Sequence, residues 1–262
     1  MAPPSKQPTW NPGQYLKFAG QRMRPAIDLL NQVALEAPDT VYDLGCGPGN
    51  ITPFLKGRWP AARHVGIDSS AEMLDKARIE HPDDEWVQGD AATWAPDAPA
   101  QLIYSNAALQ WIDNHAALFP RLMDQLVPGG VLAVQMPHNH GAPSHTGMRE
   151  VAEDGPWRAK LEPVLREFPV HDPDVYYDYL APHAASLNIW ESVYAQVMDG
   201  DNPIAEWTKG SALKPLLDAL TDADENAAFF QAYSARMQEA YPKRADGKTL
   251  FHFRRLFIVA VK

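Results

Sequence analysis

The chain is poor in cysteine, and it lacks both a long apolar run and a cluster of basic residues. Its single cysteine, Cys46, cannot form a disulfide within the chain, which is typical of a protein from a reducing compartment. No apolar segment is long enough to cross a membrane, and residues 1–10 do not contain the hydrophobic stretch of a secretory signal. We therefore expect a cytoplasmic protein without a membrane partner.

Positive charge is also scarce, since the 262 residues include 23 Lys and Arg against 33 Asp and Glu, for a net charge of −10. Nucleic-acid-binding proteins usually carry a basic stripe, so a nucleic-acid partner is not expected. A small anion is still a compatible ligand, because a few buried arginines can bind it despite the negative net charge of the chain. Clusters of His, Cys, Asp and Glu with metal-ligand spacing are missing, so we predict no metal. We expect a monomer or weak homo-oligomer that acts on a small molecule.

The most informative stretch that is present is VYDLGCGPGN at residues 41–50. An apolar start followed by D-x-G-x-G-x-G predicts a buried strand, a tight glycine-rich turn and a helix. Asn50 stands where the dinucleotide fingerprint G-x-G-x-x-G has its third glycine, so a phosphate cradle is not indicated. The spacing instead resembles motif I of the S-adenosylmethionine-dependent methyltransferases. Their sulfonium cofactor needs close backbone approach and a carboxylate, which Asp43 can supply. The alternative for this motif alone is an ordinary strand-to-helix turn.

Two later segments each predict a strand that ends in an acidic residue. The first is VGIDSS at residues 65–70, where Asp68 can accept hydrogen bonds from both hydroxyls of a ribose. Its alternative is that Asp68 caps the next helix with help from the serines that follow. The second is WVQGDA at residues 86–91, where Asp90 can accept from an adenine amino group while the Ala91 backbone donates to the ring. Its alternative is a surface turn.

A fourth predicted strand lies in LIYSNAALQW at residues 102–111 and ends at Asn106. The carboxyl ends of parallel strands meet at one edge of a sheet, and ligands bind in the crevice outside them. Four consecutive strand ends with polar residues therefore predict one pocket, in which Asn106 faces the place of methyl transfer.

Strands that alternate with helices favour an α/β fold with a doubly wound parallel sheet. We expect strands near Val41, Val65, Val87, Ile103 and Val131, followed by a sixth at 188–198 and a seventh at 256–261. The resemblance to methyltransferase motif I implies a Rossmann-like, seven-stranded methyltransferase sheet with the last strand antiparallel, and the segment after the fifth strand predicts a helical cap. A helix is expected to start at Asn11-Pro12, because Asn is a good cap and Pro fits the first helical position. The expected division is a disordered tail at 1–9, an N-terminal lid helix at 10–37, a core at 38–137 and 188–262 that includes the helices after the sixth strand, and a helical cap insertion at 138–187.

With these motifs in place, the chain resembles the trans-aconitate 2-methyltransferase family of the S-adenosylmethionine-dependent methyltransferases. The glycine turn and the strand ends are generic to that superfamily. The N-terminal segment, Gln-Met-Pro and Met-Arg-Glu are more specific. The resemblance covers most of the chain and is carried by WNP at 10–12 with the following Tyr15, RMRPA at 22–26, DLGCGPGN at 43–50, GIDSS at 66–70, NAALQW at 106–111, GVLAVQMP at 130–137, MREVA at 148–152, YYD at 176–178 and RLFIVA at 255–260.

This resemblance implies that the chain esterifies one carboxylate of a small polycarboxylic acid, with trans-aconitate as substrate and S-adenosylmethionine as cofactor. S-adenosylhomocysteine would be the product. The residues expected to bind the cofactor are Tyr15, Arg22, Asp43, Gly45, Cys46, Gly47, Asn50, Asp68, Ser69, Met73, Asp90, Ala91 and Asn106. The residues expected to bind the substrate are Gln110, Trp111, His140, Arg149, Tyr176, Tyr177 and Arg255.

Several of these assignments have ordinary structural alternatives. Arg149 can be a solvated helix charge beside Glu150 and Glu153. His140 can be a plain loop histidine, and Trp111 can pack the wall of the site. Arg22 can extend its apolar stem along a helix face, with its charge in water.

The reaction does not require a side chain that activates the substrate. A carboxylate is already ionised at neutral pH, because its reference pKa is about 4, so no general base is needed. We therefore expect no catalytic residue, and positioning by Asn106 and Gln110. Two other functions fit a similar core: methylation of a malonyl group on a carrier protein, and cofactor binding without catalysis.

Overall fold

The computed structural model describes residues 20, 23–165, 167, 169–210 and 212–262. Contacts between residues divide the chain into two compact units. Unit 1 comprises residues 1–136, 169–191 and 256–262, and unit 2 comprises residues 137–168 and 192–255. The helix expected to start at Asn11 lies outside the described residues, as do Tyr15 and Arg22.

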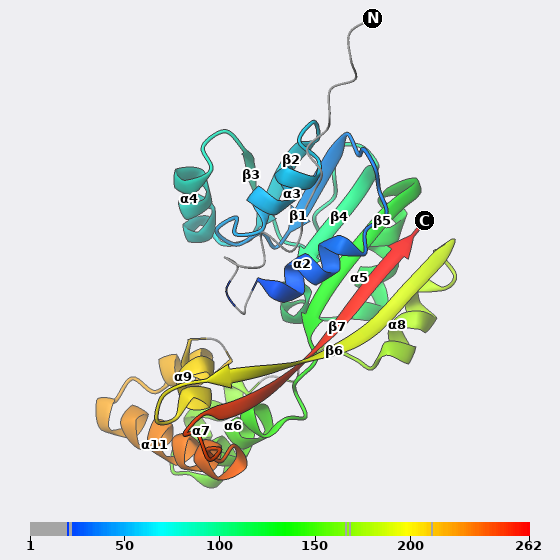
Figure 1. Ribbon diagram of the computed structural model, residues 1–262. Helices are drawn as coiled ribbons and strands as arrows, with labels where there is room; N and C mark the ends of the chain where they lie inside the picture. Colours follow the sequence, from blue (N-terminus) through cyan, green and yellow to red (C-terminus); the bar gives the residue numbers. More distant parts are fainter. Residues whose placement is uncertain (1–19, 21–22, 166, 168, 211) are drawn as a thin grey trace, which may run out of the picture. The chain divides into compact units, whose positions relative to one another are not determined.

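A seven-stranded sheet runs through the described residues in the order β3-β2-β1-β4-β5-β7-β6 (Figure 1). The pairs β2–β3, β1–β2, β1–β4 and β4–β5 are parallel, whereas the arrowheads of β7 and β6 point in opposite directions. The order and the antiparallel last strand confirm the predicted methyltransferase sheet. The strands are β1 Thr40–Leu44, β2 Arg63–Asp68, β3 Glu85–Gln88, β4 Ala100–Asn106, β5 Leu126–Pro137, β6 Ser186–Met198 and β7 Thr249–Val261.

Strand register brings the predicted polar ends to one edge of unit 1. Asp43 of β1 pairs with Gly66 of β2 on one side and with Tyr104 of β4 on the other. The next strand along, β5, places Gln135 beside Asn106. Because these four strands are parallel, the turns that follow β1, β2 and β4 leave the sheet at the same edge.

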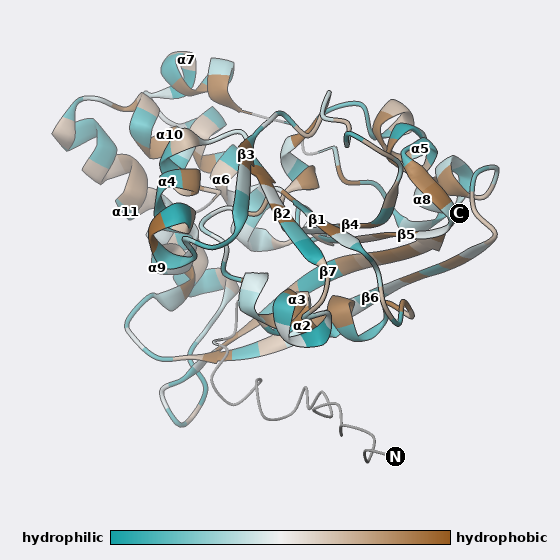
Figure 2. Ribbon diagram, turned by 90° about the horizontal axis from the view of Figure 1, so that it is seen from above, coloured by the Kyte–Doolittle hydropathy of each residue, from teal (hydrophilic) through white to brown (hydrophobic). Residues whose placement is uncertain are grey.

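The two faces of the sheet in unit 1 carry different helices. Ile103 packs in a core with Phe119 of α5 (His115–Asp124) and Leu180 of α8 (Pro173–Leu180). Side chains alternate along a strand, so Tyr104 points to the opposite face. There its hydroxyl donates to the Ala26 carbonyl oxygen of α2 (Arg24–Asn31) at 2.6 Å. Figure 2 shows brown, hydrophobic stretches along the central strands between these helical layers. The remaining helices of unit 1 in the described part of the chain are α3 Thr52–Arg58, α4 Ala71–Glu80 and the 3-10 turn η1 Leu109–Trp111.

Unit 2 has a core of its own. Apolar side chains of α6 (Pro143–Asp154), α11 (Ala223–Ala240) and the first half of β7 meet there, as illustrated by Met148, Phe229 and Phe251. The Tyr233 hydroxyl donates within this core to the Ser144 carbonyl oxygen at 2.9 Å. The other helices described in unit 2 are α7 Arg158–Leu161, η2 Glu162–Val164, α9 Pro203–Lys209 and α10 Lys214–Ala219. None of the helices described in either unit is long and apolar enough to cross a membrane.

The observed units differ from the expected division in two places. Helix α8 was expected in the cap insertion at 138–187, but it belongs to unit 1, where its buried Tyr176 and Leu180 join the core beneath the sheet. Helices α9 to α11 were expected with the core, but they pack with α6 and α7 in unit 2. The last strand is also longer than expected, because it begins at Thr249 with an alternation of buried and exposed side chains.

Candidate active site

The glycine turn after β1 is shaped by close backbone approach. Gly45 has φ +79°, and a Cβ there would lie 2.1 Å from the Cβ of Ala108. Gly47 has φ +55°, but a Cβ at this position would meet no atom of the described chain within 4 Å. The Gly45 and Cys46 amides both donate to the Ile67 carbonyl oxygen, at 2.7 and 3.0 Å. The turn is therefore held against β2 on one side and against the segment after β4 on the other, while Gly47 borders open space.

Asp43 lies at the base of this turn and is only 4% exposed. Its Oδ2 atom has no hydrogen-bond partner among the described residues. Burial raises the pKa of this carboxyl to about 7, and the nearby negative charge of Asp68 adds to the effect. A buried carboxylate oxygen without a donor is unfavourable, so Asp43 is suited to a ligand that brings a positive charge or an N–H group.

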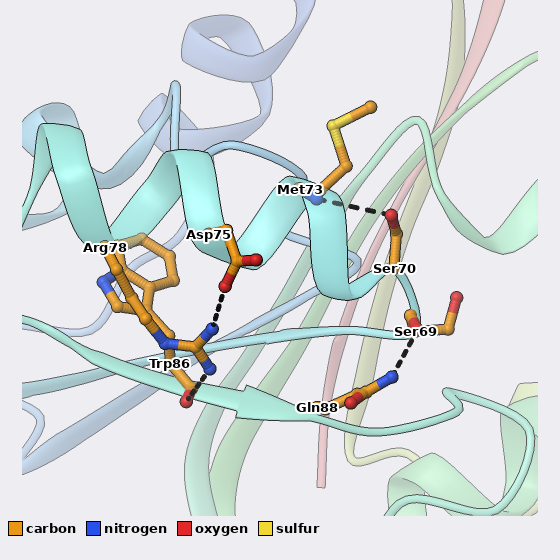
Figure 3. A network of polar contacts seen from close by, with 7 residues as sticks. All are labelled: Ser69, Ser70, Met73, Asp75, Arg78, Trp86 and Gln88. Atoms are coloured by element: carbon orange, nitrogen blue, oxygen red, sulfur yellow. Dashed lines mark hydrogen bonds and ion pairs between the residues drawn. The ribbon is translucent and has the colours of Figure 1, made fainter.

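Asp68 organises the segment between β2 and α4. Its Oδ2 accepts from the Gly47 amide at 2.8 Å and its Oδ1 accepts from the Ser70 amide at 2.9 Å. Ser70, not Asp68, is the helix cap, because its hydroxyl accepts from the Met73 amide at 3.3 Å (Figure 3). Figure 3 also shows Gln88 of β3 donating to the Ser69 carbonyl oxygen at 3.1 Å. Two amides thus fix the Asp68 carboxylate beside the glycine turn, and each of its oxygens keeps a lone pair for a further donor.

The loop after β3 is a compact turn built around Asp90. Asp90 Oδ1 accepts from the Ala92 amide at 2.9 Å, so the side chain stabilises its own turn, as the alternative interpretation suggested. Arg121 of α5 donates to the carbonyl oxygens of Ala91 and Trp94, both at 2.6 Å. Arg121 could not be identified from the sequence, because a helical segment does not show which loop an arginine side chain contacts.

The segment after β4 is held in an unusual conformation. Ala107 has φ +54°, which is costly for a residue with a Cβ and is typical of functional sites. Its amide donates to the Gln135 carbonyl oxygen at 2.8 Å, and its carbonyl oxygen accepts from Gln110 Nε2 at 2.7 Å. Among the described residues, the buried atoms Asn106 Oδ1 and Gln110 Oε1 have no hydrogen-bond partner. Two orphaned amide oxygens and the Asp43 carboxylate therefore lie around the three turns at the sheet edge.

The substrate candidates in unit 1 have different surroundings. Tyr176 has no exposed surface, and its hydroxyl lies 2.6 Å from His115 Nδ1. Tyr177 and Trp111 are exposed, with 58% and 44% of their surfaces accessible. Tyr176 thus belongs to the core in this structure, while its neighbour on α8 faces solvent.

The substrate candidates in unit 2 are His140, Arg149 and Arg255. Burial lowers the pKa of His140 to about 3, with smaller contributions from the nearby His145 and His138. Arg149 is half exposed and lies 3.6 Å from Glu153 one turn along α6, which matches the solvated pair considered above. Arg255 is buried and stacks over the ring of Phe253, 4.7 Å from its centroid. A cationic side chain that binds an anion inside a protein has to be buried in this way.

Cys46 is buried inside the glycine turn. Burial raises the pKa of its thiol, and the charges of Asp43 and Asp68 raise it further. A thiol that is hard to ionise is a poor nucleophile, so this cysteine acts as a small packing residue.

The sheet order, the glycine turn and the polar strand ends are those of Rossmann-like methyltransferases. A family profile for the methyltransferase domain matches residues 41–130 of the chain. The crystal structure of YcgJ protein from Bacillus subtilis aligns with a TM-score of 0.56 at 14% identity, covering 90% of this chain and 97% of that one. At this identity the likeness shows the fold. These observations place the protein in the methyltransferase class.

Whole-chain relatives give the family. The trans-aconitate 2-methyltransferase of Azoarcus sp. (strain BH72) is 52% identical over 255 residues, which is 97% of this chain and 100% of the relative. The enzyme of the same name from Rhodopseudomonas palustris (strain BisB18) is 47% identical over 254 residues, covering 97% and 99%. The chain therefore belongs to the trans-aconitate 2-methyltransferase family of S-adenosylmethionine-dependent methyltransferases.

Proposed function

We propose that this protein transfers a methyl group from S-adenosylmethionine to one carboxylate of trans-aconitate and releases a monomethyl ester. The observation that carries the proposal is the 52% identity over 97% of the chain to a relative named for this reaction. The buried oxygens of Asp43, Asn106 and Gln110, which lack partners among the described residues, support a polar ligand at the sheet edge.

The residues at this edge fit the cofactor. We assign the carboxylate of Asp68 to its ribose hydroxyls and the loop of Asp90 and Ala91 to its adenine. The open space beside Gly47 allows the cofactor to approach the backbone closely. The buried carboxylate of Asp43, whose Oδ2 has no partner among the described residues, can bind the charged amino-acid end of the cofactor. The further predicted contacts are Gly45, Cys46, Asn50, Ser69 and Met73, with Tyr15 and Arg22 outside the described residues.

The cofactor supplies a methyl group on a positively charged sulfur, which a carboxylate oxygen can attack directly. The protein then has to position the substrate rather than activate it, because the carboxylate is already ionised at neutral pH. Correct placement of two reactants can lower a barrier by roughly 7–11 kcal/mol. Asn106 and the buried amide of Gln110 are the residues that we assign to this positioning.

All the substrate contacts, including that of Gln110, stay predictions. Trp111 and Tyr177 have the exposed surface that contact with a substrate needs. The assignments of Arg149 and Arg255 rest on the resemblance and on the affinity of guanidinium groups for carboxylates. The assignment of His140 rests on the resemblance and on the hydrogen bond that its ring can make to the substrate. We also keep the predictions of a cytoplasmic compartment and of a monomer or weak homo-oligomer, and light scattering after gel filtration tests the latter.

The direct test is incubation of the protein with methyl-labelled S-adenosylmethionine and trans-aconitate. We expect transfer of label into a base-labile methyl ester, with cis-aconitate, citrate and malonyl-loaded carrier protein as comparison substrates. Gln110→Ala should lower kcat by at least about tenfold, because misplacement of the reactants is costly. Gln101→Ala is the matched control, since Gln101 lies near the other end of β4 and holds the Asp39 and Thr40 amides. Absence of label in every polycarboxylate contradicts the proposal, and preference for the carrier protein replaces it.

A further inference from the structure

A chain of hydrogen bonds runs through the core of unit 1 to the turn that carries Gln110. The His171 amide donates to the Tyr176 hydroxyl oxygen at 3.3 Å. That hydroxyl lies 2.6 Å from His115 Nδ1, and His115 Nε2 lies 2.9 Å from the Leu109 carbonyl oxygen. The chain therefore links the segment before α8 to the first residue of η1.

Only one arrangement of protons satisfies all three contacts with a neutral ring. The Leu109 carbonyl can only accept, so His115 Nε2 carries the hydrogen and donates to it. His115 Nδ1 then has a free lone pair, and the Tyr176 hydroxyl donates to it. The same hydroxyl oxygen accepts from the His171 amide. Burial lowers the pKa of His115, which favours the neutral ring that this assignment needs.

Both side chains are closed off from solvent. His115 is 1% exposed and Tyr176 is 0% exposed. Their rings pack with Phe119, whose centroid lies 4.8 Å from Tyr176 and 5.2 Å from His115. Tyr176 was predicted to contact the substrate. In this structure it is buried in the core of unit 1, and its hydroxyl connects it to the site through His115.

The chain of hydrogen bonds ends at the turn formed by residues 107–111, and this turn needs to be held in place. Ala107 adopts a left-handed conformation that isolated alanine disfavours. Among the described residues, it is held by one hydrogen bond from Gln110 within the turn and one to Gln135 of β5. The bond from His115 to Leu109 restrains the other end of the same turn, directly before Gln110. Local backbone strain of this kind persists when the surroundings over-determine it.

We propose that His115 and Tyr176 are positioning residues, which hold residues 107–111 so that Gln110 and Asn106 meet the reacting groups. This role rests on the proposed function of Gln110 and Asn106 in methyl transfer. It predicts a larger effect on the rate of transfer than on cofactor binding. The predicted cofactor contacts Asp43, Asp68 and Asp90 make no hydrogen bond to His115 or Tyr176 among the described residues, whereas Asn106 directly precedes the held turn.

The central experiment is Tyr176→Phe, which removes one oxygen and leaves the packed ring. We expect kcat to fall about tenfold or more, since a displacement of about 1 Å at the reacting groups can cost about 100-fold. The Kd for S-adenosylhomocysteine should stay within about twofold of wild type. Tyr179→Phe is the matched control, because Tyr179 lies on the same helix and touches the Tyr176 ring edge-on, 6.1 Å between centroids. We expect it to behave as wild type.

A second readout does not depend on catalysis. The amides of Trp111 and Ile112 donate to the carbonyl oxygens of Ala108 and Leu109 within the held turn. Tyr176→Phe should speed hydrogen exchange at these two amides about tenfold, and Tyr179→Phe should not. His115→Gln, which keeps an amide donor in reach of Leu109, should retain more activity than His115→Ala.

The outcomes separate the two proposals. If wild type does not methylate trans-aconitate but Tyr176→Phe still loosens the turn, the proposed function fails and the holding role stands. An unchanged kcat together with unchanged exchange at Trp111 and Ile112 overturns the holding role. Equal loss of kcat, cofactor affinity and thermal stability also overturns it, because that pattern is a general core defect.

Discussion

At the scale of single residues, Asp43 carries a carboxyl group that the fold keeps away from water. Its pKa of about 7 in the folded protein compares with about 3.9 for an unfolded aspartate. A raised folded pKa means that the folded state binds more protons between these two values. The contribution of Asp43 to stability is therefore fully present below about pH 4 and is lost as the pH rises through about 7.

The resulting prediction concerns Asp43→Asn in the cofactor-free protein. Ionisation of Asp43 should cost up to about 4 kcal/mol, at 1.36 kcal/mol for each unit of pKa. Wild type should then lose stability from pH 5 to pH 8, and the variant should lose less, as measured by urea unfolding at each pH. Asp75→Asn is the control, because Asp75 is an exposed carboxylate paired with Arg78. Parallel curves for wild type and Asp43→Asn would rule out a buried, raised carboxyl.

Residue types at strand ends made part of this site predictable from the sequence. Asp43 and Asp68 could be assigned because a parallel sheet brings the ends of its strands to one edge. Ala107 and His115 could not be, since neither the left-handed turn nor the contact with Tyr176 leaves a local pattern. Tyr176 was predicted to contact the substrate, but only its place in the core reveals the hydrogen bond that it makes.

At the scale of elements, α2 ends in a contact with the helix that follows the glycine turn. Arg58, the last residue of α3, donates to the Leu30 carbonyl oxygen at 2.5 Å and to that of Val33. The neighbouring Trp59 donates to the Leu35 carbonyl oxygen at 3.0 Å. Carbonyl groups at a helix C-terminus lack partners inside the helix, and a cation there also meets the negative end of the helix dipole. Arg58 thus fastens α2 to the element that positions the glycine turn.

We predict that Arg58→Lys destabilises the protein by about 1.5–3 kcal/mol, because an ammonium group cannot reproduce the forked contact of a guanidinium. Arg63→Lys serves as the comparison. Arg63 makes an exposed pair with Glu85 at 2.6 Å, and such pairs contribute less than about 1 kcal/mol. Urea unfolding monitored by tryptophan fluorescence measures both. A loss at Arg58 no larger than at Arg63 would show that the contact with α2 is not needed for stability.

Helices and strands with a clear hydrophobic pattern could be predicted from the sequence. The packing of elements whose partners are distant in the sequence could not. The five parallel strands follow from apolar runs between turns, and each appears near its predicted centre. The packing of α8 in unit 1 could not be predicted, because its proline-rich surroundings hide the pair of residues, Tyr176 and Leu180, that joins the core there. The early half of β7 was missed because its alternating side chains pack into unit 2, apart from the apolar run that marks its end.

At the scale of the whole molecule, the described part of the chain forms two units with separate cores. All the predicted cofactor contacts that the structure describes belong to unit 1, from Asp43 to Asn106. A ligand stabilises only the state that binds it, by roughly 2.7 kcal/mol when its concentration is 100 times its Kd. Local opening reactions of unit 1 should therefore respond to the cofactor more than those of unit 2.

Hydrogen exchange with and without S-adenosylhomocysteine tests this difference. At 100 times the Kd, we expect amides at 43–50, 66–73 and 89–94 to exchange up to about 100-fold more slowly, since 1.4 kcal/mol corresponds to about tenfold. Helices α6 and α11 pack in the core of unit 2 and serve as the internal reference. The exchange rates of their amides should change by less than about threefold. Slowing of equal size in α6 and α11 would mean that the two units open together. Slowing confined to these helices would place the cofactor in unit 2 and contradict the site at the edge of the sheet.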